Sequence, residues 1–124
     1  MAERTYSFPK SHRLSGRLQF AAVFDAKVRE SRGPLNVYGL RNDLGHARLG
    51  ISISRRVGTA PLRNRIKRLL RESFRLMQHD LPRGYDFVVV VRPHAPLMLA
   101  DYQRLLSASA VKLHHAWQRK ENGA

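Results

Sequence analysis

The chain has 124 residues, 43% of them hydrophobic, and it contains no cysteine. This length suits one domain with a real core, which we expect to span residues 1–124, and the lack of cysteine excludes disulfides and thiolate metal sites. Lys and Arg number 23 against nine Asp and Glu, a formal net charge of +14. Because so large an excess repels itself in a compact fold, it indicates a polyanionic partner, and we favour nucleic acid over acidic membranes or acidic proteins.

The sequence carries no targeting or membrane signal. Residues 1–17 are polar, and no run of about 18 apolar residues occurs, so neither a signal peptide nor a membrane span is predicted. We therefore expect a cytoplasmic protein without a membrane partner. Residues 1–12 show no periodicity and are expected to form an irregular lead-in.

A first helix is predicted to begin at Ser15, because apolar residues recur there at spacings of three and four. These residues are Leu14, Leu18, Ala21, Phe24 and Val28. Residues 31–34 end the pattern with a turn signal, although the stretch 29–34 could also hold a short extra strand.

Two strands are predicted next, at 35–40 and 48–54, separated by the turn residues 42–45. Strict alternation in the second strand and the short turn favour a hairpin of adjacent strands. In that arrangement Asn36 and Tyr38 would present a polar face beside that of the second strand.

The second half of the chain alternates helix and strand. A long helix is predicted with Thr59 as its N-cap and Pro61 in its first turn. Residues 87–91 are apolar on both faces, which is typical of a central strand. A last helix is expected at about 99–119, followed by a short polar tail at 120–124. The order of elements predicts an α+β sandwich, one sheet with helices packed against it.

The segment 54–75 carries the most specific signal, because its many basic residues accompany a single acid, Glu72. On a helix, a basic stripe (Arg63, Lys67, Arg71 and Arg75) would lie opposite an apolar arc (Leu62, Ile66, Leu69, Leu70, Phe74 and Met77). Asn64 lies among the cations, where an amide can donate to phosphate. A phosphate-binding face is favoured over a solvated face that is basic by chance. It is also favoured over a membrane-surface helix, because the core needs the apolar arc.

Two further features are compatible with single-stranded RNA. Phe20 and Phe24 lie one turn apart at the edge of an apolar arc, where a half-exposed ring can stack on a base, although both rings could equally be core. In the strand at 48–54, Leu49, Ile51 and Ile53 point one way, and Arg48, Gly50, Ser52 and Ser54 point the other. The second, small polar face could be the floor of an RNA groove or simply a solvated strand face.

Three stretches occur together in a familiar order and spacing: FAAVF at 20–24, RLGISISRRVG at 48–58 and RNRIKRLLRE at 63–72. They resemble the protein subunit of bacterial ribonuclease P, and the resemblance extends over about residues 8–118. It implies an αβββαβα fold, a four-stranded sheet with three helices like the second domain of ribosomal protein S5. It also implies a left-handed βαβ crossover, against the usual right-handed preference.

The resemblance implies a function as well. In that family the catalyst is a large RNA. The protein binds this catalytic RNA and the 5′ leader of precursor tRNA, and it assists the endonucleolytic removal of the leader that leaves the mature 5′ end. The protein alone is expected not to be catalytic, and Mg²⁺ is expected on the RNA of the holoenzyme and not on the protein by itself.

The resemblance also assigns residues to two surfaces. Those implied to contact the catalytic RNA or phosphates near the cleavage site are Arg55, Arg56, Arg63, Asn64, Arg65, Lys67, Arg68 and Arg71. Those implied to line the leader groove are Phe20, Phe24, Tyr38, Ser52 and Ser54. Arg55 and Arg56 stand where the family often has lysines, which keeps the charge.

The residues themselves indicate no independent nuclease site. The nine acids are scattered without paired spacing, His114 and His115 point apart on a helix, and His94 has no obvious partner. Two other functions stay open. One is a ribosomal or generic RNA-binding protein. The other is a DNA-binding module, which the lack of a paired recognition helix disfavours, so no DNA partner is expected.

Overall fold

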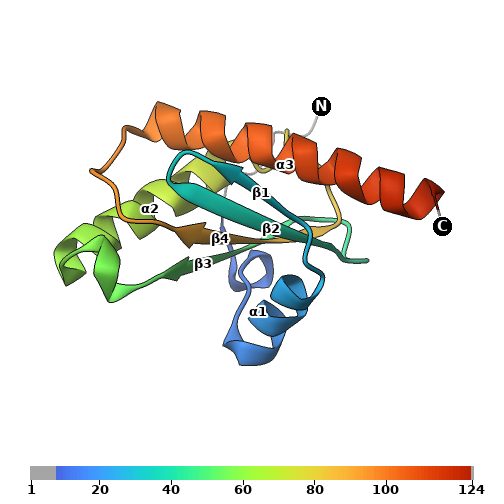
Figure 1. Cartoon of the computed structure of the whole chain (residues 1–124), viewed down its shortest axis with the longest axis horizontal. Helices are drawn as coiled ribbons and strands as arrows, with labels where there is room; N and C mark the ends of the chain where they lie inside the picture. The colour runs from blue at the N-terminus through green and yellow to red at the C-terminus, as the bar shows by residue number, and fades with distance from the viewer. Residues whose placement is uncertain (1–7, 124) are drawn as a thin grey trace.

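The sheet has four strands in the order β1-β2-β4-β3, with helices on both faces (Figure 1). The computed structural model describes residues 8–123, so residues 1–7 of the predicted lead-in and Ala124 of the predicted tail lie outside it. The elements are η1 (Lys10–His12), α1 (Gly16–Asp25), β1 (Arg29–Arg32), β2 (Leu35–Arg41), β3 (Arg48–Ile53), η2 (Arg55–Val57), α2 (Ala60–Met77), β4 (Tyr85–Val91) and α3 (Leu99–Asn122). The lead-in therefore ends in a 3-10 turn, and α3 takes up most of the predicted tail.

Strand β4 lies inside the sheet, antiparallel to β2 and parallel to β3, while β1 pairs antiparallel with β2. The predicted hairpin between 35–40 and 48–54 is therefore wrong, because β4 separates these two strands. The reason is that β4 is apolar on both faces and must have a strand on each edge and helices over both faces to leave water. The short strand considered at 29–34 is present as β1. The left-handedness of the β3–α2–β4 crossover stays a prediction.

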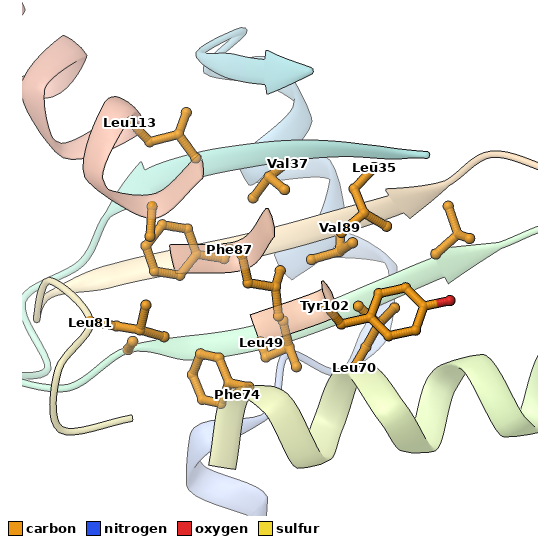
Figure 2. Close-up of a cluster of buried hydrophobic side chains, with 14 of the residues drawn as sticks. Leu35, Val37, Leu49, Leu70, Phe74, Leu81, Phe87, Val89, Tyr102 and Leu113 are labelled. Carbon is orange, nitrogen blue, oxygen red and sulfur yellow. The ribbon is translucent and has the colours of Figure 1, made fainter. Parts of the chain in front are cut away.

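The larger core lies between the sheet and the two long helices (Figure 2). Leu70 and Phe74 of α2 and Leu113 of α3 are almost fully buried. They pack with Leu35, Val37, Leu49, Phe87, Val89 and Tyr102. The apolar arc predicted for the basic helix is confirmed, since its remaining members are buried or partly buried in the same cluster.

The start of α2 follows the prediction. The Thr59 hydroxyl accepts a hydrogen bond from the backbone N–H of Leu62 at 3.4 Å, and Pro61 stands in the first turn, where its missing N–H costs nothing. The preceding Gly58 has φ 154°. Side-chain-bearing residues rarely adopt this backbone conformation, and a Cβ there would also lie 2.4 Å from Leu62 Cδ2, so a substitution would strain this entry into the helix.

The helix on the opposite face of the sheet is α1 (Figure 1). Its small core consists of Leu14, Val23 and Val88, with Phe20, Phe24, Tyr38, Leu40 and Val90 packed around it and partly buried. Leu18, predicted in the apolar arc, is 86% exposed. The prediction fails because Leu14 precedes the helix and joins the sheet instead, donating its N–H to Leu49 O at 2.9 Å. The helix then faces the sheet through Phe20, Val23 and Phe24, and Leu18 lies on its outer side.

A buried ion pair joins β3 to β4. Arg48 donates from Nε and Nη2 to the two carboxylate oxygens of Asp86 at 2.8 and 2.7 Å, and Asn42 Nδ2 donates to the same carboxylate at 2.7 Å. The hydrogen bonds that Arg48 donates to Asp86 raise the pKa of Arg48 above its ordinary value. The charge of Arg48 is thus neutralised within the fold, and Asn42 ties the turn after β2 to the same group.

Replacement of Asp86 by Ala leaves the Arg48 guanidinium without its counter-charge. Only 7% of the Asp86 side chain and 19% of the Arg48 side chain are exposed. We expect Asp86→Ala to lower the free energy of unfolding by about 3 kcal/mol, measured by urea denaturation. Glu121→Ala removes the more exposed pair with Arg41 and is the control, with an expected loss of about 1 kcal/mol or less. Equal losses in the two variants would contradict this account.

Candidate nucleic-acid interface

The outer side of α2 and the η2 turn before it present a continuous row of cations. Arg55 and Arg56 in η2 are exposed, as are Arg65, Arg68 and Arg71 in α2. Asn64 is exposed among them, whereas Arg63 and Lys67 are half-buried. The segment predicted to bind phosphate is therefore one surface, which we call the basic face (Arg55, Arg56, Arg63, Asn64, Arg65, Lys67, Arg68 and Arg71).

The cations of the basic face are not neutralised by the protein. Within residues 8–123, Arg63 is the one member whose side chain forms a hydrogen bond, from its Nε to Gly58 O at 3.2 Å. Arg75, which the sequence pattern adds to the stripe, donates instead to Glu72, with its Nε 3.0 Å from Oε2. This hydrogen bond lowers the pKa of Glu72, so the pair stays ionised. The unpaired charge of the stripe therefore ends at Arg71.

Two open hollows lie along the basic face. The first, about 490 Å³, is lined by Phe8, Arg13, Arg65, Arg68, Leu69, Arg71, Glu72 and Arg75. The second, about 640 Å³, is lined by Ala60, Pro61, Asn64, Lys67, Arg68 and Arg71. A concave surface rimmed by guanidinium groups can surround a phosphate from several sides, which a flat row of charges cannot.

Phe8 and Arg13 belong to this surface although the sequence analysis did not single them out for it. The Arg13 guanidinium lies over the Phe8 ring, 4.7 Å from its centroid, and Nη2 donates to Phe8 O at 3.2 Å. The Phe8 ring packs on Phe74 at a centroid distance of 5.5 Å. No periodicity in the lead-in pointed to these contacts, because they are made by a short irregular segment that crosses the end of α2.

The aromatic residues predicted for the leader groove come together on the α1 side of the sheet. The rings of Phe24 and Tyr38 meet edge to face at 4.9 Å and 79°. Phe20 lies over Gly50, where a Cβ would be 2.7 Å from the Phe20 ring. All three rings are half-buried. From the sequence, Phe20 and Phe24 could be either buried in the core or exposed for stacking. In the structure both rings pack on the sheet and part of each ring stays accessible.

The predicted polar floor needs a correction. Asn36 and Tyr38 do not lie beside β3, because β4 inserts Val88 and Val90 between them. Ser52 is half-buried and Ser54 exposed, as a floor would require, but the middle of the floor is valine. The sequence did not predict that Val90 lies on this surface, because the apolar run 87–91 is typical of a strand that is buried on both faces. The shortness of α1 leaves this one valine partly uncovered.

The basic face and the α1 side meet at the edge of the sheet formed by β3. A small hollow of about 100 Å³ there is lined by Phe8, Arg13, Leu14, Phe20, Leu49, Gly50, Ile51 and Arg71. Arg71 of α2 and Phe20 of α1 thus reach the same hollow from opposite faces of the sheet. A single extended strand of nucleic acid could contact both surfaces by passing over this edge.

Several histidine side chains make contacts within the fold, and no metal site is formed in the described residues. In the part of the chain that the structure describes, no group of three or more His, Asp or Glu side chains is placed to hold a metal ion. His94, for which the sequence indicated no partner, has two, the Tyr102 hydroxyl and Arg92 O, both at 2.7 Å. Burial lowers the pKa of His114, whose Nδ1 lies 2.8 Å from the Tyr85 hydroxyl. Among residues 8–123, no helix is long and apolar enough to cross a membrane.

This fold and charge distribution define a class of protein, the small basic α+β proteins with a surface for a polyanion. The family model described as Ribonuclease P matches residues 8–121, so the chain belongs to the ribonuclease P protein family. The ribonuclease P protein component of Escherichia coli is 43% identical over 115 residues, covering 91% of this chain and 90% of the relative. That of Methylococcus capsulatus is 47% identical over 91 residues, 73% of this chain and 70% of the relative.

Solved structures agree with this assignment. The ribonuclease P protein of Staphylococcus aureus superposes with a TM-score of 0.72 at 29% identity, covering 85% of this chain and 96% of that one. The protein from Thermotoga maritima gives a TM-score of 0.69 at 29% identity, with 76% and 90% covered. The chain is accordingly a subunit of ribonuclease P, an endoribonuclease of tRNA processing, and it associates with the ribonuclease P RNA.

The close approach of Phe20 to Gly50 can be tested directly. Gly50→Ala places a methyl group against the ring and against Leu14 Cβ at 3.1 Å, so α1 must shift. We expect a loss of about 1–3 kcal/mol in the free energy of unfolding, measured by urea denaturation. Gly39→Ala is the matched control, because its Cβ would meet Leu113 at an ordinary 3.4 Å. A Gly50 variant as stable as the Gly39 variant would mean that α1 does not depend on this contact.

Proposed function

We propose that this protein acts in the cytoplasm as the subunit of ribonuclease P that binds the catalytic RNA through its basic face and the 5′ leader of precursor tRNA on the α1 side of the sheet. The observation that carries the proposal is that Arg71, a basic-face cation with no side-chain partner in the described residues, and the half-buried ring of Phe20 line one hollow on the β3 edge. Phosphate contacts hold an RNA, and ring contacts suit unpaired bases.

The basic face is assigned to the catalytic RNA and to phosphates near the cleavage site. Its members are Arg55, Arg56, Arg63, Asn64, Arg65, Lys67, Arg68 and Arg71. The hydrogen bond from Arg63 to Gly58 gives that residue a second role, since it steadies the turn that carries Arg55 and Arg56. Arginine suits this surface because its planar fork donates to two phosphate oxygens at once.

The α1 side is assigned to the leader. Its members are Phe20, Phe24, Tyr38, Ser52 and Ser54, to which the fold adds Val90. A leader is single-stranded, so its bases are available for stacking on rings and for contact with a valine surface.

The hydrolysis itself is assigned to the RNA. Metal ions such as Mg²⁺ would be held mainly by RNA phosphates and would supply an activated water for attack on the phosphodiester. The contribution of this chain is to screen the negative charge of two RNA molecules and to position the leader. The experiment that tests the whole proposal is cleavage of a precursor tRNA at low Mg²⁺ by a bacterial catalytic RNA, with and without the protein. Stimulated cleavage at the mature 5′ end, with none by the protein alone, is expected, and no stimulation would contradict it.

Loss of two cations from the basic face should weaken assembly in a salt-dependent way. The double variant Arg65→Ala, Arg68→Ala is expected to raise the Kd for the catalytic RNA and to reduce the slope of log K against log salt by about 0.7–0.9 per lost phosphate contact. The control is Lys112→Ala, Arg119→Ala, which removes the same charge from exposed positions of α3. An unchanged slope in the α2 variant, or equal changes in both, would remove the basic face from the interface.

Loss of the Phe20 ring should affect precursor tRNA more than mature tRNA. Phe20→Ala is expected to weaken holoenzyme binding of precursor tRNA by about 1–3 kcal/mol, the worth of one base stack, and to leave mature tRNA unchanged. Phe20→Leu keeps apolar packing on Gly50 and serves as a second variant if the first is poorly folded. Leu18→Ala on the outer side of α1 is the control. Equal losses for the two tRNAs would count against leader binding here.

A further inference from the structure

We propose that a histidine-lined hollow beyond the end of α2 binds a phosphate group of RNA and takes up a proton when it does so. Its volume is about 120 Å³, several times the ~30 Å³ that one water molecule occupies. We call it the histidine hollow. Gly45 and Ala47 contribute to it, and its larger side chains are His12, His46, Gln78, His79 and Arg83. It lies outside the basic face and the α1 side, so it adds a third RNA contact to the two of the proposed function.

Three segments that are distant in the sequence bring the histidines together. His12 ends η1, His46 lies in the turn between β2 and β3, and His79 follows α2. The rings of His12 and His46 pack on each other with their centroids 4.2 Å apart and their planes at 35°. All three imidazoles are half-buried, and Arg83 is exposed. Three titratable rings and one permanent cation therefore share a small, partly dry space.

The charges around His12 all have the same sign. The groups that face it are His46 from the turn before β3, and His79 and Arg83 from the segment after α2, and no acidic side chain of residues 8–123 lines the hollow. Burial lowers the pKa of His12, and His46 lowers it further. A hydrogen bond with Gln78 opposes this, and His79 adds a smaller decrease. The ring of His12 is therefore mostly neutral at neutral pH, and an anion in the hollow would favour its charged form.

The hydrogen bond of His46 also links phosphate binding to a proton. Its Nε2 lies 3.1 Å from Ser11 O, and because a carbonyl can only accept, this nitrogen carries the proton of the neutral ring. The other nitrogen, Nδ1, can donate to a phosphate oxygen only after the ring has gained a second proton. A phosphate that uses both rings as donors must therefore raise the number of protons bound.

The chemistry of the hollow suits an anion better than a metal ion. Arg83 is permanently positive and repels a cation. Within the described residues, no group of three His, Asp or Glu side chains is placed to hold a metal. The end of α2 offers little to a cation either, since Met77 O already accepts hydrogen bonds from the N–H groups of Asp80 and Leu81, at 2.8 and 3.1 Å.

The position of the hollow favours RNA as the source of the phosphate. Arg13 and Arg75 line the 490 Å³ hollow of the basic face, and the residues just beyond them, His12 and Gln78, line the histidine hollow. The two hollows thus follow one another along the same pair of segments, the lead-in and α2. From Arg71 to the last residue of α2 the helix rises only about 9 Å. A strand of RNA on the basic face can therefore continue to the histidines.

The test measures the Kd of the full-length protein for a bacterial catalytic RNA at fixed salt and Mg²⁺, from about pH 8 to about pH 6, across the ordinary titration range of histidine. The unmodified protein is expected to bind about tenfold more tightly at the lower pH, which corresponds to a rise of about one unit in the pKa of one group on binding. His46→Gln and His12→Gln keep a polar side chain without a charge and are expected to lose most of this gain. His115→Gln, at an exposed position of α3, is the control and should retain it.

Equal pH dependence in all four proteins would overturn the inference. So would weaker binding by the unmodified protein at the lower pH, which is the behaviour of a metal site, where protons compete for the imidazoles. A second measurement, NMR titration of the His12 ring in the free protein with and without inorganic phosphate, identifies the source. A raised pKa with phosphate, but an RNA Kd that does not depend on His46, would mean that the hollow binds free phosphate and that RNA is wrong. Affinity at about pH 8 reports on the basic face separately, and circular dichroism at each pH checks the fold of each variant.

Discussion

The burial of β4 on both faces is the constraint on which the rest of the structure depends. Every residue of Tyr85–Val91 is buried except Val90, including an aspartate that takes its counter-charge from β3. This requires β2 and β3 on the two edges, α2 and α3 over one face and α1 over the other. At ten residues α1 is only about 15 Å long, so it leaves part of its face open. The surface proposed for the leader is therefore the part of the sheet that the core does not need.

The few acids determine where the positive charge of the protein emerges. Within the described residues, five acids pair with arginines: Glu30 with Arg32, Glu72 with Arg75, Asp86 with Arg48, Asp101 with Arg104 and Glu121 with Arg41. None of these arginines belongs to the basic face. The basic face therefore keeps its positive charge, because the acids of these five pairs lie against arginines elsewhere. A field with such a shape attracts a polyanion and also orients it before contact.

The parts that could be predicted from the sequence are those governed by local rules. Helical periodicity and the Thr59 cap were sufficient to place α2 and its exposed cations, because both depend on residues a few positions apart. Strand neighbours could not be predicted in this way, since alternation tells which face a residue takes but not which strand lies beside it. For the same reason the partial exposure of Val90 could not be predicted, since it depends on the length of α1, which is distant in the sequence. Phe8 and Arg13 depend on a tertiary contact with Phe74 that leaves no periodic trace.

The like charges along α2 connect the folding of the protein to its assembly. Arg63, Lys67 and Arg71 follow one another at intervals of four, and each such pair costs a helix a few tenths of a kcal/mol. An RNA bound to the basic face as proposed would remove this repulsion, and a ligand that binds only the folded state shifts the folding equilibrium towards it. The RNA would thereby be a part of the electrostatic balance of the helix, and the protein without its RNA would be the less stable form.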